Sequence, residues 1–191
     1  MKTLKILILA LMAGSTLLIT SCNKDENEPT SNIKVKMTDF NDGKSLNNTD
    51  SLDLFSEVNV HIESVAIHYG DTNGNIVWMD LPTNSGMYNL LELDNTMVII
   101  ATGGELPVGY IGQMRLVLGN DNYVVIDSVA HDLQTPSAQQ SGLKLNLNFT
   151  AEAGSTYEIV LNFDVDESIV LQGNGGFLLK PMLRVESIIA I

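Results

Sequence analysis

Apolar residues at every second position dominate this chain, and this period-two pattern restricts its fold more than any other feature of the sequence. Successive side chains of a β-strand point to opposite faces of a sheet, so such alternation predicts strands with one buried face. The clearest runs are LKLNLNF at 143–149 and YEIVLNF at 157–163, with the turn residues A-E-A-G-S between them. We expect these two runs to form a β-hairpin.

The run from 58 to 69 alternates in two phases, and the change of phase falls near Glu63 or Ser64. One extra residue absorbed in a strand is a β-bulge, which we expect at this point. The pair Asn73-Gly74 separates this run from 76–81. Both residue types accept a positive φ, so the pair predicts a tight hairpin between the two strands.

Apolar runs bounded by turn residues indicate further strands along the chain. We expect them at 33–38, 87–93, 110–118, 122–127, 129–134, 168–171 and 177–189. Residues 94–102 fit either a short helical turn or another strand. Many short strands with little helical periodicity predict an all-β fold, a β-sandwich with immunoglobulin-like or prealbumin-like topology.

The first residues are typical of a signal peptide. Lys2 and Lys5 precede a mostly apolar run from 6 to 19, which is shorter than the roughly 20 residues of a membrane-spanning helix. The run ends in L-I-T-S-C, which resembles a lipobox, and Cys22 is the chain's single cysteine. We expect cleavage after residue 21 and acylation, such as palmitate, on Cys22, so that the acyl chains hold the protein to a membrane. An ordinary secretory signal with an incidental cysteine is the alternative.

The segment after Cys22, NKDENEPTSN at 23–32, contains no apolar residue. We expect 22–32 to be a lipidated, flexible tether and 33–191 to be a single β-sandwich domain. The acidic stretch Lys24-Asp25-Glu26 resembles signals that send lipoproteins to the outer face of the outer membrane. Polar tethers are common, however, and a periplasmic orientation stays open beside the cell surface.

The charge of the chain argues against nucleic acid as a partner. Without residues 1–21 and their two lysines, eight Lys and Arg remain against 23 Asp and Glu, a net charge of −15. Binding to phosphates requires clustered cations. After Lys44, only Arg115, Lys144, Lys180 and Arg184 carry a positive charge.

Several segments together resemble a known family. They are VNVHIESVAIHY at 58–69, YNLLEL at 88–93, LPVGYIGQMRLVLG at 106–119, LQTPSAQQSGLKL at 133–145 and LLKPMLRV at 178–185. These segments look like the bacterial and archaeal domain-of-unknown-function family numbered 4382. The resemblance implies a signal-bearing lipoprotein with a carbohydrate-binding-like β-sandwich, and it implies no activity or ligand.

The loop 134–142 is rich in hydroxyl and amide groups, which can hydrogen-bond sugar hydroxyls or an extended peptide. The alternative is that Thr135, Ser137 and Ser141 satisfy backbone groups in a crossover between sheets. Trp78, the single tryptophan, fits either a core position or an exposed platform for a sugar ring. The candidate ligand-binding residues are Trp78, Thr135, Ser137, Gln139, Gln140, Ser141 and Lys144.

No pattern indicates catalysis, a cofactor or a metal. His61 and His68, on one polar face, lie roughly 20 Å apart along their strand and cannot share a metal. A G-x-S-x-G motif is absent from the sequence. Whether the acidic cluster at 164–167 binds calcium stays open. We therefore expect a non-enzymatic binding module of the cell envelope, with glycan as its first ligand class. The alternative is a structural, assembly or adhesion protein that binds a protein partner through a sheet edge.

Overall fold

A computed structural model describes residues 29–39, 54–70, 75–93, 96–135 and 141–191. The expected signal peptide and Cys22 lie outside these residues. The first strand begins at Thr30 rather than at residue 33, so residues 30–32 belong to the domain and not to the tether. Within the described part of the chain, the helices lack the length and apolar character that crossing a membrane requires.

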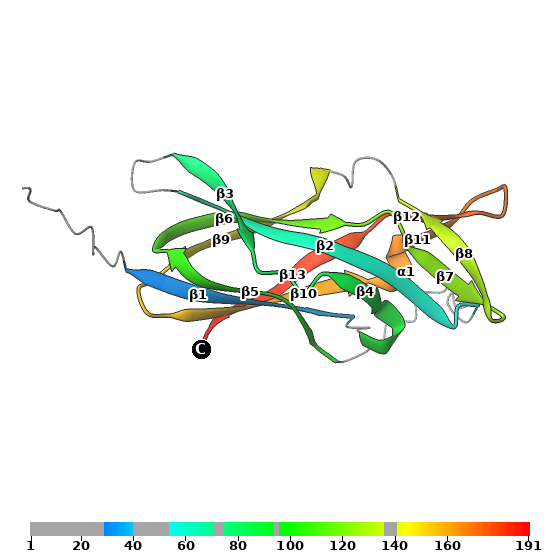
Figure 1. The fold of residues 1–191 in the computed structure, drawn as a ribbon, viewed down its shortest axis with the longest axis horizontal. Helices are drawn as coiled ribbons and strands as arrows, with labels where there is room; N and C mark the ends of the chain where they lie inside the picture. Colours follow the sequence, from blue (N-terminus) through cyan, green and yellow to red (C-terminus); the bar gives the residue numbers. More distant parts are fainter. Residues whose placement is uncertain (1–28, 40–53, 71–74, 94–95, 136–140) are drawn as a thin grey trace, which may run out of the picture.

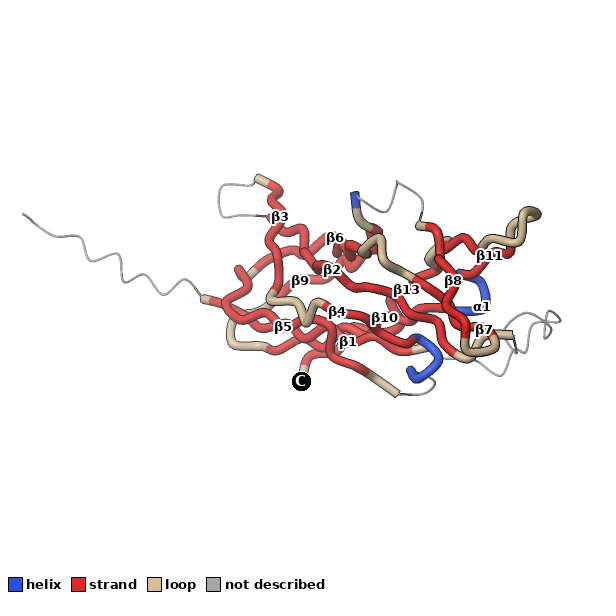
Figure 2. The backbone as a smooth tube through the Cα atoms, turned by 45° about the vertical axis from the view of Figure 1, so that its right-hand side comes forward, coloured by secondary structure: helices blue, strands red, loops and turns tan. Residues whose placement is uncertain are grey.

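Two β-sheets pack face to face and confirm the predicted all-β sandwich (Figures 1 and 2). The smaller sheet has the strand order β13-β10-β1-β5, and β1 runs parallel to β10. Its strands are β1 (Thr30–Thr38), β5 (Val98–Pro107), β10 (Thr156–Asp164) and β13 (Met182–Ala190).

The larger sheet has the order β11-β12-β8-β7-β2-β6-β9, and β3 and β4 also pair with β2. Its long strands are β2 (Glu57–Gly70), β6 (Gly109–Leu118) and β9 (Leu143–Ala151). Its shorter strands are β3 (Ile76–Leu81), β4 (Gly86–Asn89), β7 (Tyr123–Ile126), β8 (Val129–Gln134), β11 (Ile169–Leu171) and β12 (Phe177–Leu179). Two one-turn helices complete the described elements, η1 (Leu90–Leu93) and α1 (Val165–Ser168).

The core lies between the two sheets and consists of the alternating apolar residues. On β2 the inward side chains include Val60, Ile62 and Val65, and on β10 they include Ile159 and Phe163, all fully buried. Burial of one such side chain contributes about 1.5–3 kcal/mol. The intervening polar residues therefore lie on the outer faces of the sheets, where a ligand can reach them.

The predictions for β2 are confirmed. Its register with β6 shifts between Ile62 and Ser64, which is the expected bulge. Strands β2 and β3 pair antiparallel as expected, and the turn residues Asn73 and Gly74 lie outside the described residues. Because the bulge keeps both halves of β2 facing the core, His61 and His68 share the outer face of the sheet.

The hairpin expected between 143–149 and 157–163 is wrong. Strand β9 pairs with β6 in the larger sheet, whereas β10 pairs with β1 and β13 in the smaller one. The turn with Gly154, at φ 74°, thus carries the chain from one sheet to the other. The rings of Phe149 and Tyr157 meet across the core, 4.8 Å between centroids. Alternation shows which face of a strand is buried but not which strand it pairs with. Here the buried faces of β9 and β10 face each other across the core.

Two other boundaries differ from the sequence prediction, and the structure decides one segment that the sequence left open. The strand expected at 87–93 ends at Asn89 and continues as η1. Of the open segment 94–102, the part from Val98 onward is strand β5. The strand expected at 177–189 is divided at Pro181 into β12 and β13, because proline has no N–H to donate to a neighbouring strand.

Candidate functional site

The polar loop predicted as a binding site is described only at its two ends. Ser137, Gln139 and Gln140 lie outside the described residues. Thr135 Oγ1 accepts a hydrogen bond from Asn122 Nδ2 at 2.6 Å and donates one to the carbonyl of Leu133. The structural alternative for Thr135 therefore fits its contacts. Ser141 and Lys144 are exposed at the other end of the loop.

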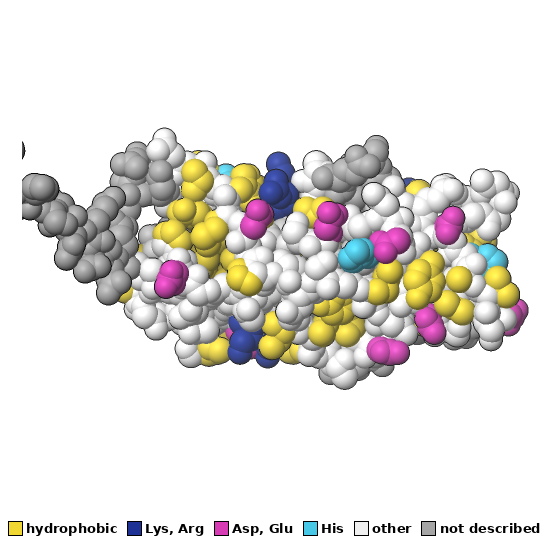
Figure 3. Space-filling model, viewed as in Figure 1, with side chains coloured by type: hydrophobic (Ala, Val, Ile, Leu, Met, Phe, Trp, Pro, Cys, Tyr) yellow, Lys and Arg dark blue, Asp and Glu magenta, His cyan; other side chains and the backbone are white. Residues whose placement is uncertain are grey.

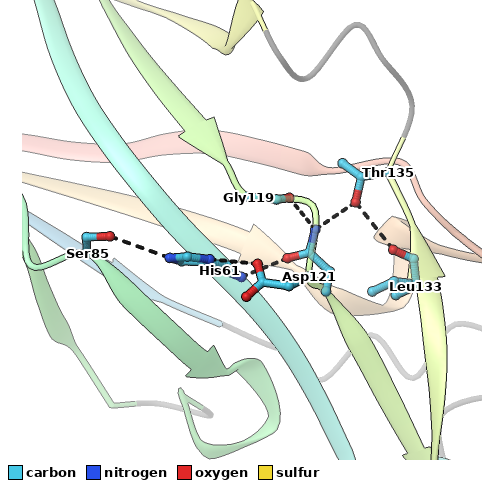
Figure 4. A network of polar contacts seen from close by, with 7 residues as sticks. His61, Ser85, Gly119, Asp121, Leu133 and Thr135 are labelled. Carbon is cyan, nitrogen blue, oxygen red and sulfur yellow. Dashed lines mark hydrogen bonds and ion pairs between the residues drawn. The ribbon is translucent and has the colours of Figure 1, made fainter.

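Asn122 lies where the chain leaves β6 and enters β7, and its side chain bonds to His61, Gly119 and Thr135, which are labelled in Figure 4. Its Nδ2 also donates to the carbonyl of Gly119 at 2.7 Å, and its Oδ1 accepts from the N–H of His61 at 2.7 Å. His61 lies on β2 between the residues that pair with β6 and those that pair with β7. The buried side chain of Asn122 thus supplies the hydrogen bond that a neighbouring strand would otherwise make.

The same network contains a serine, a histidine and an aspartate in line (Figure 4). His61 Nδ1 lies 2.7 Å from Asp121 Oδ1, and His61 Nε2 lies 3.5 Å from Ser85 Oγ. The hydrogen bond from His61 lowers the pKa of Asp121. In Ser-His-Asp catalysis the carboxylate is buried, whereas 65% of the Asp121 side chain is exposed. We interpret this trio as a surface contact that joins β2 to the β6–β7 turn.

A polar pocket of about 410 Å³ lies beside this turn. Its walls include Asn120, Asp121, Asp132 and Gln134, together with one aromatic residue, Tyr123. The pocket is acidic, and Tyr123 is half-buried. It is a second place to which a polar ligand could bind, and Tyr123 offers a comparison for the aromatic residues of the main candidate site.

Trp78 lies on the outer face of the larger sheet and not in the core. It is half-buried and pairs with His68 across β3 and β2. The two rings contact each other with 4.8 Å between centroids, and the Arg115 guanidinium lies 4.8 Å from the indole centroid. Trp78 is therefore neither a core residue nor a fully exposed platform for a sugar, because His68 and Arg115 already cover much of its ring.

Tyr110 is the exposed aromatic side chain of this face, with 55% of its surface accessible. A Cβ atom at Gly112 would lie 3.3 Å from Tyr110 Cε1 and 3.6 Å from His68 Nδ1. The Tyr110 ring therefore lies along the sheet over the bare glycine. Its hydroxyl donates a 2.7 Å hydrogen bond to Asn148 Oδ1, which fixes the ring in place. Tyr110 is not among the residues predicted from sequence, although its place in the polar phase of the alternation, beside the buried Ile111, is a usable signal.

Amide side chains of β6 and β9 lie beside Tyr110, and two cations lie farther along the same two strands. Gln113 Nε2 donates to Asn146 Oδ1 at 3.0 Å, and Arg115 pairs with Lys144 across β6 and β9. We call this surface the aromatic–amide face. It consists of His68, Trp78, Tyr110, Gln113, Arg115, Lys144, Asn146 and Asn148. Of the residues predicted from sequence, the structure brings Trp78 and Lys144 to this face.

On the face that Figure 3 shows, acidic side chains are scattered singly, while basic ones gather in few places. The cluster at 164–167 does not form a metal site in the structure. Asp164 caps α1 by accepting a hydrogen bond from the Glu167 N–H, and it lies 3.6 Å from Arg184. Among the described residues, no three His, Cys, Asp or Glu side chains lie where they could share a metal ion. Burial and the neighbouring carboxylates raise the pKa of Asp166.

Comparison with known proteins agrees with the resemblance seen in the sequence. A family model described as "Domain of unknown function (DUF4382)" matches residues 30–181. No curated protein and no solved structure matches the chain. The matched residues cover most of the chain and nearly all of the sandwich, so the protein belongs to the DUF4382 family.

Proposed function

We propose that this protein is a cell-envelope lipoprotein whose β-sandwich binds glycan on the aromatic–amide face, without catalysis. The observation that carries the proposal is Tyr110. Its ring is exposed, lies over Gly112 and is held by Asn148. Such a ring is already ordered before a ligand arrives, so binding costs little side-chain entropy.

The chemistry around Tyr110 fits a sugar better than an apolar ligand. A sugar ring has C–H groups that pack on an aromatic face and hydroxyls that need donors and acceptors at its edge. Asn146 and Asn148 use their oxygens within the face, and their Nδ2 groups have no partner among the described residues. These amide groups can donate to sugar hydroxyls beside Tyr110.

The binding test compares the two aromatic sites of the larger sheet. The full chain, in a non-ionic detergent, is screened against immobilised polysaccharides, and the same screen is run on Tyr110→Ala and Tyr123→Ala. We expect specific binding that Tyr110→Ala abolishes and Tyr123→Ala retains. Loss of binding only in Tyr123→Ala would place the ligand in the polar pocket, and no binding by the wild-type chain would refute a glycan ligand.

The membrane anchor is the second part of the proposal and rests on the L-I-T-S-C motif. Each methylene of an acyl chain contributes about 0.8 kcal/mol to membrane binding. We expect cells to incorporate labelled palmitate into the wild-type chain and not into Cys22→Ala, which should leave the membrane fraction. Protease added to intact cells then separates a surface position from a periplasmic one. A Cys22→Ala protein that stays entirely with the membranes would refute lipid anchoring.

An envelope assembly role is the alternative, and strand β13 favours it. β13 is an edge strand of the smaller sheet, and Met182 and Ile189 are 48% and 52% exposed on it. An edge strand with exposed apolar side chains can accept a strand from a partner. Ile189→Lys should abolish such an interaction and leave glycan binding unchanged, which co-purification from envelope extracts measures.

A further inference from the structure

Three hydrogen-bond donors on the aromatic–amide face have no acceptor among the described residues: the Trp78 indole N–H, the Arg115 guanidinium and the Lys144 ammonium. Arg115 and Lys144 lie directly opposite each other on β6 and β9. Their Cβ atoms are therefore about 5 Å apart. Like charges on directly opposite positions of neighbouring strands are destabilising, so the pair has a cost in the free protein.

Carboxylates outnumber cations in this chain, with 23 Asp and Glu against 10 Lys and Arg. Among the described residues Lys36 lies 2.9 Å from Glu158 and Arg184 lies within 4 Å of two carboxylates, whereas Lys34 and Lys180, like Arg115 and Lys144, form no salt bridge. Arg115 and Lys144 differ from Lys34 and Lys180 in standing directly opposite each other. The nearest acidic residue in the row of Arg115 is Asp80, two strands away. The two backbone positions are roughly 10 Å apart, and the two side chains form no salt bridge. The loop residues PSAQQ at 136–140 carry no carboxylate.

Arg115 is also held in position. Its guanidinium stacks on Trp78, and its aliphatic stem lies against Gly142, where a Cβ atom would overlap Cγ of Arg115. Gly142 has φ 80°, a conformation that glycine adopts without strain. Stacking on an aromatic ring leaves the edge of a guanidinium available to a planar anion. Among the described residues, the fold therefore orders a cation without an anionic partner.

We propose that the aromatic–amide face binds an acidic oligosaccharide, with a uronate carboxylate on Arg115 and Lys144 and a sugar ring on Tyr110. This inference rests on the proposed glycan-binding function and narrows it to one class. Five residues of β6 separate Tyr110 from Arg115, roughly 16 Å along the strand. One sugar ring does not span this distance, so the site selects an oligosaccharide of several residues.

The test uses a pair of ligands that differ only in charge: a galacturonate oligosaccharide and its methyl ester. Calorimetric titration of the full chain in detergent gives both dissociation constants. We expect the acid to bind at least tenfold more tightly than the ester, because charge-assisted hydrogen bonds are the stronger ones. Raising the salt concentration should reduce this preference.

Variants test whether Arg115 and Lys144 cause the preference for the acid over the ester. Arg115→Gln and Lys144→Gln should each weaken binding of the acid about tenfold or more and leave binding of the ester nearly unchanged. Lys144 is exposed, so its variant keeps the test informative even if Arg115→Gln fails to fold. Lys180→Gln removes the same charge from the turn between β12 and β13 and should bind the acid as the wild type does.

Three results would overturn the inference. Suppose that acid and ester bind with equal affinity and that Tyr110→Ala weakens both. This result would support the proposed glycan site but refute its selectivity for acidic sugars. Equal weakening by Lys180→Gln, together with equally tight binding of dextran sulfate, would show attraction of any polyanion. Absence of binding by either oligosaccharide and by neutral polysaccharides would overturn both this inference and the proposed function.

Discussion

Asn122 joins three parts of the larger sheet, and its replacement by alanine should destabilise the fold more than any other polar substitution near the β6–β7 turn. The side chain is 3% exposed and makes three hydrogen bonds of 2.6–2.7 Å, to His61, Gly119 and Thr135. A hydrogen bond contributes about 0.5–1.5 kcal/mol net, and an unsatisfied buried polar group costs about 1–3 kcal/mol. Asn122 lines the polar pocket, from which solvent can hydrogen-bond some of the freed groups, so we expect Asn122→Ala to lower the free energy of unfolding by about 2–4 kcal/mol.

Urea denaturation followed by tryptophan fluorescence measures this loss, and the slope of the transition should not change. Asn120→Ala, at an exposed position two residues earlier, is the control and should change stability by less than about 0.5 kcal/mol. Hydrogen exchange at the His61 amide should become faster in Asn122→Ala. If the free energy of unfolding falls by less than about 1 kcal/mol and hydrogen exchange at the His61 amide is unchanged, the Asn122 side chain does not replace the strand hydrogen bond at His61.

Three further predictions follow from the core and the charged groups. Phe163→Ala removes a fully buried ring and should lower the unfolding free energy by about 3–5 kcal/mol in the same assay. Burial and two neighbouring carboxylates raise the pKa of Asp166, so its charged form destabilises the folded protein above the ordinary aspartate pKa. Asp166→Asn should therefore raise Tm at pH 7. The gain in Tm should disappear below the ordinary aspartate pKa, where the carboxyl is protonated in both the folded and the unfolded state. Because the His61 contact lowers the pKa of Asp121, an NMR titration should give a low midpoint that His61→Ala returns to the ordinary range; an unchanged midpoint would contradict the contact.

The strands of the sandwich could be predicted from sequence because burial of one face imposes a period of two. The pairing of strands could not. Residues 143–149 and 157–163 show the same alternation whether they form a hairpin or face each other across the core. The short connection between them favours a hairpin, but in the structure the apolar face of each strand is buried against the opposite sheet.

The candidate site was predictable only in part. Trp78 is a sequence candidate as the single tryptophan, and Lys144 is one as a cation beside the polar loop. Both residues lie on the aromatic–amide face. Tyr110 becomes a platform only because Gly112 leaves room beneath its ring, and Asn148 comes from a strand 38 residues away. Such contacts depend on the register of β6 with β9, which alternation leaves undetermined.

Backbone and side-chain amide NMR spectra during titration with a bound oligosaccharide test the central claim most directly. The account predicts that shifts concentrate at Gly112, Gln113, Asn146 and Asn148 and at the Trp78 indole, with the pocket residues Asn120 and Tyr123 unchanged. Shifts that concentrate at the pocket or along β13, or a spectrum that no glycan changes, would contradict a glycan site on the aromatic–amide face.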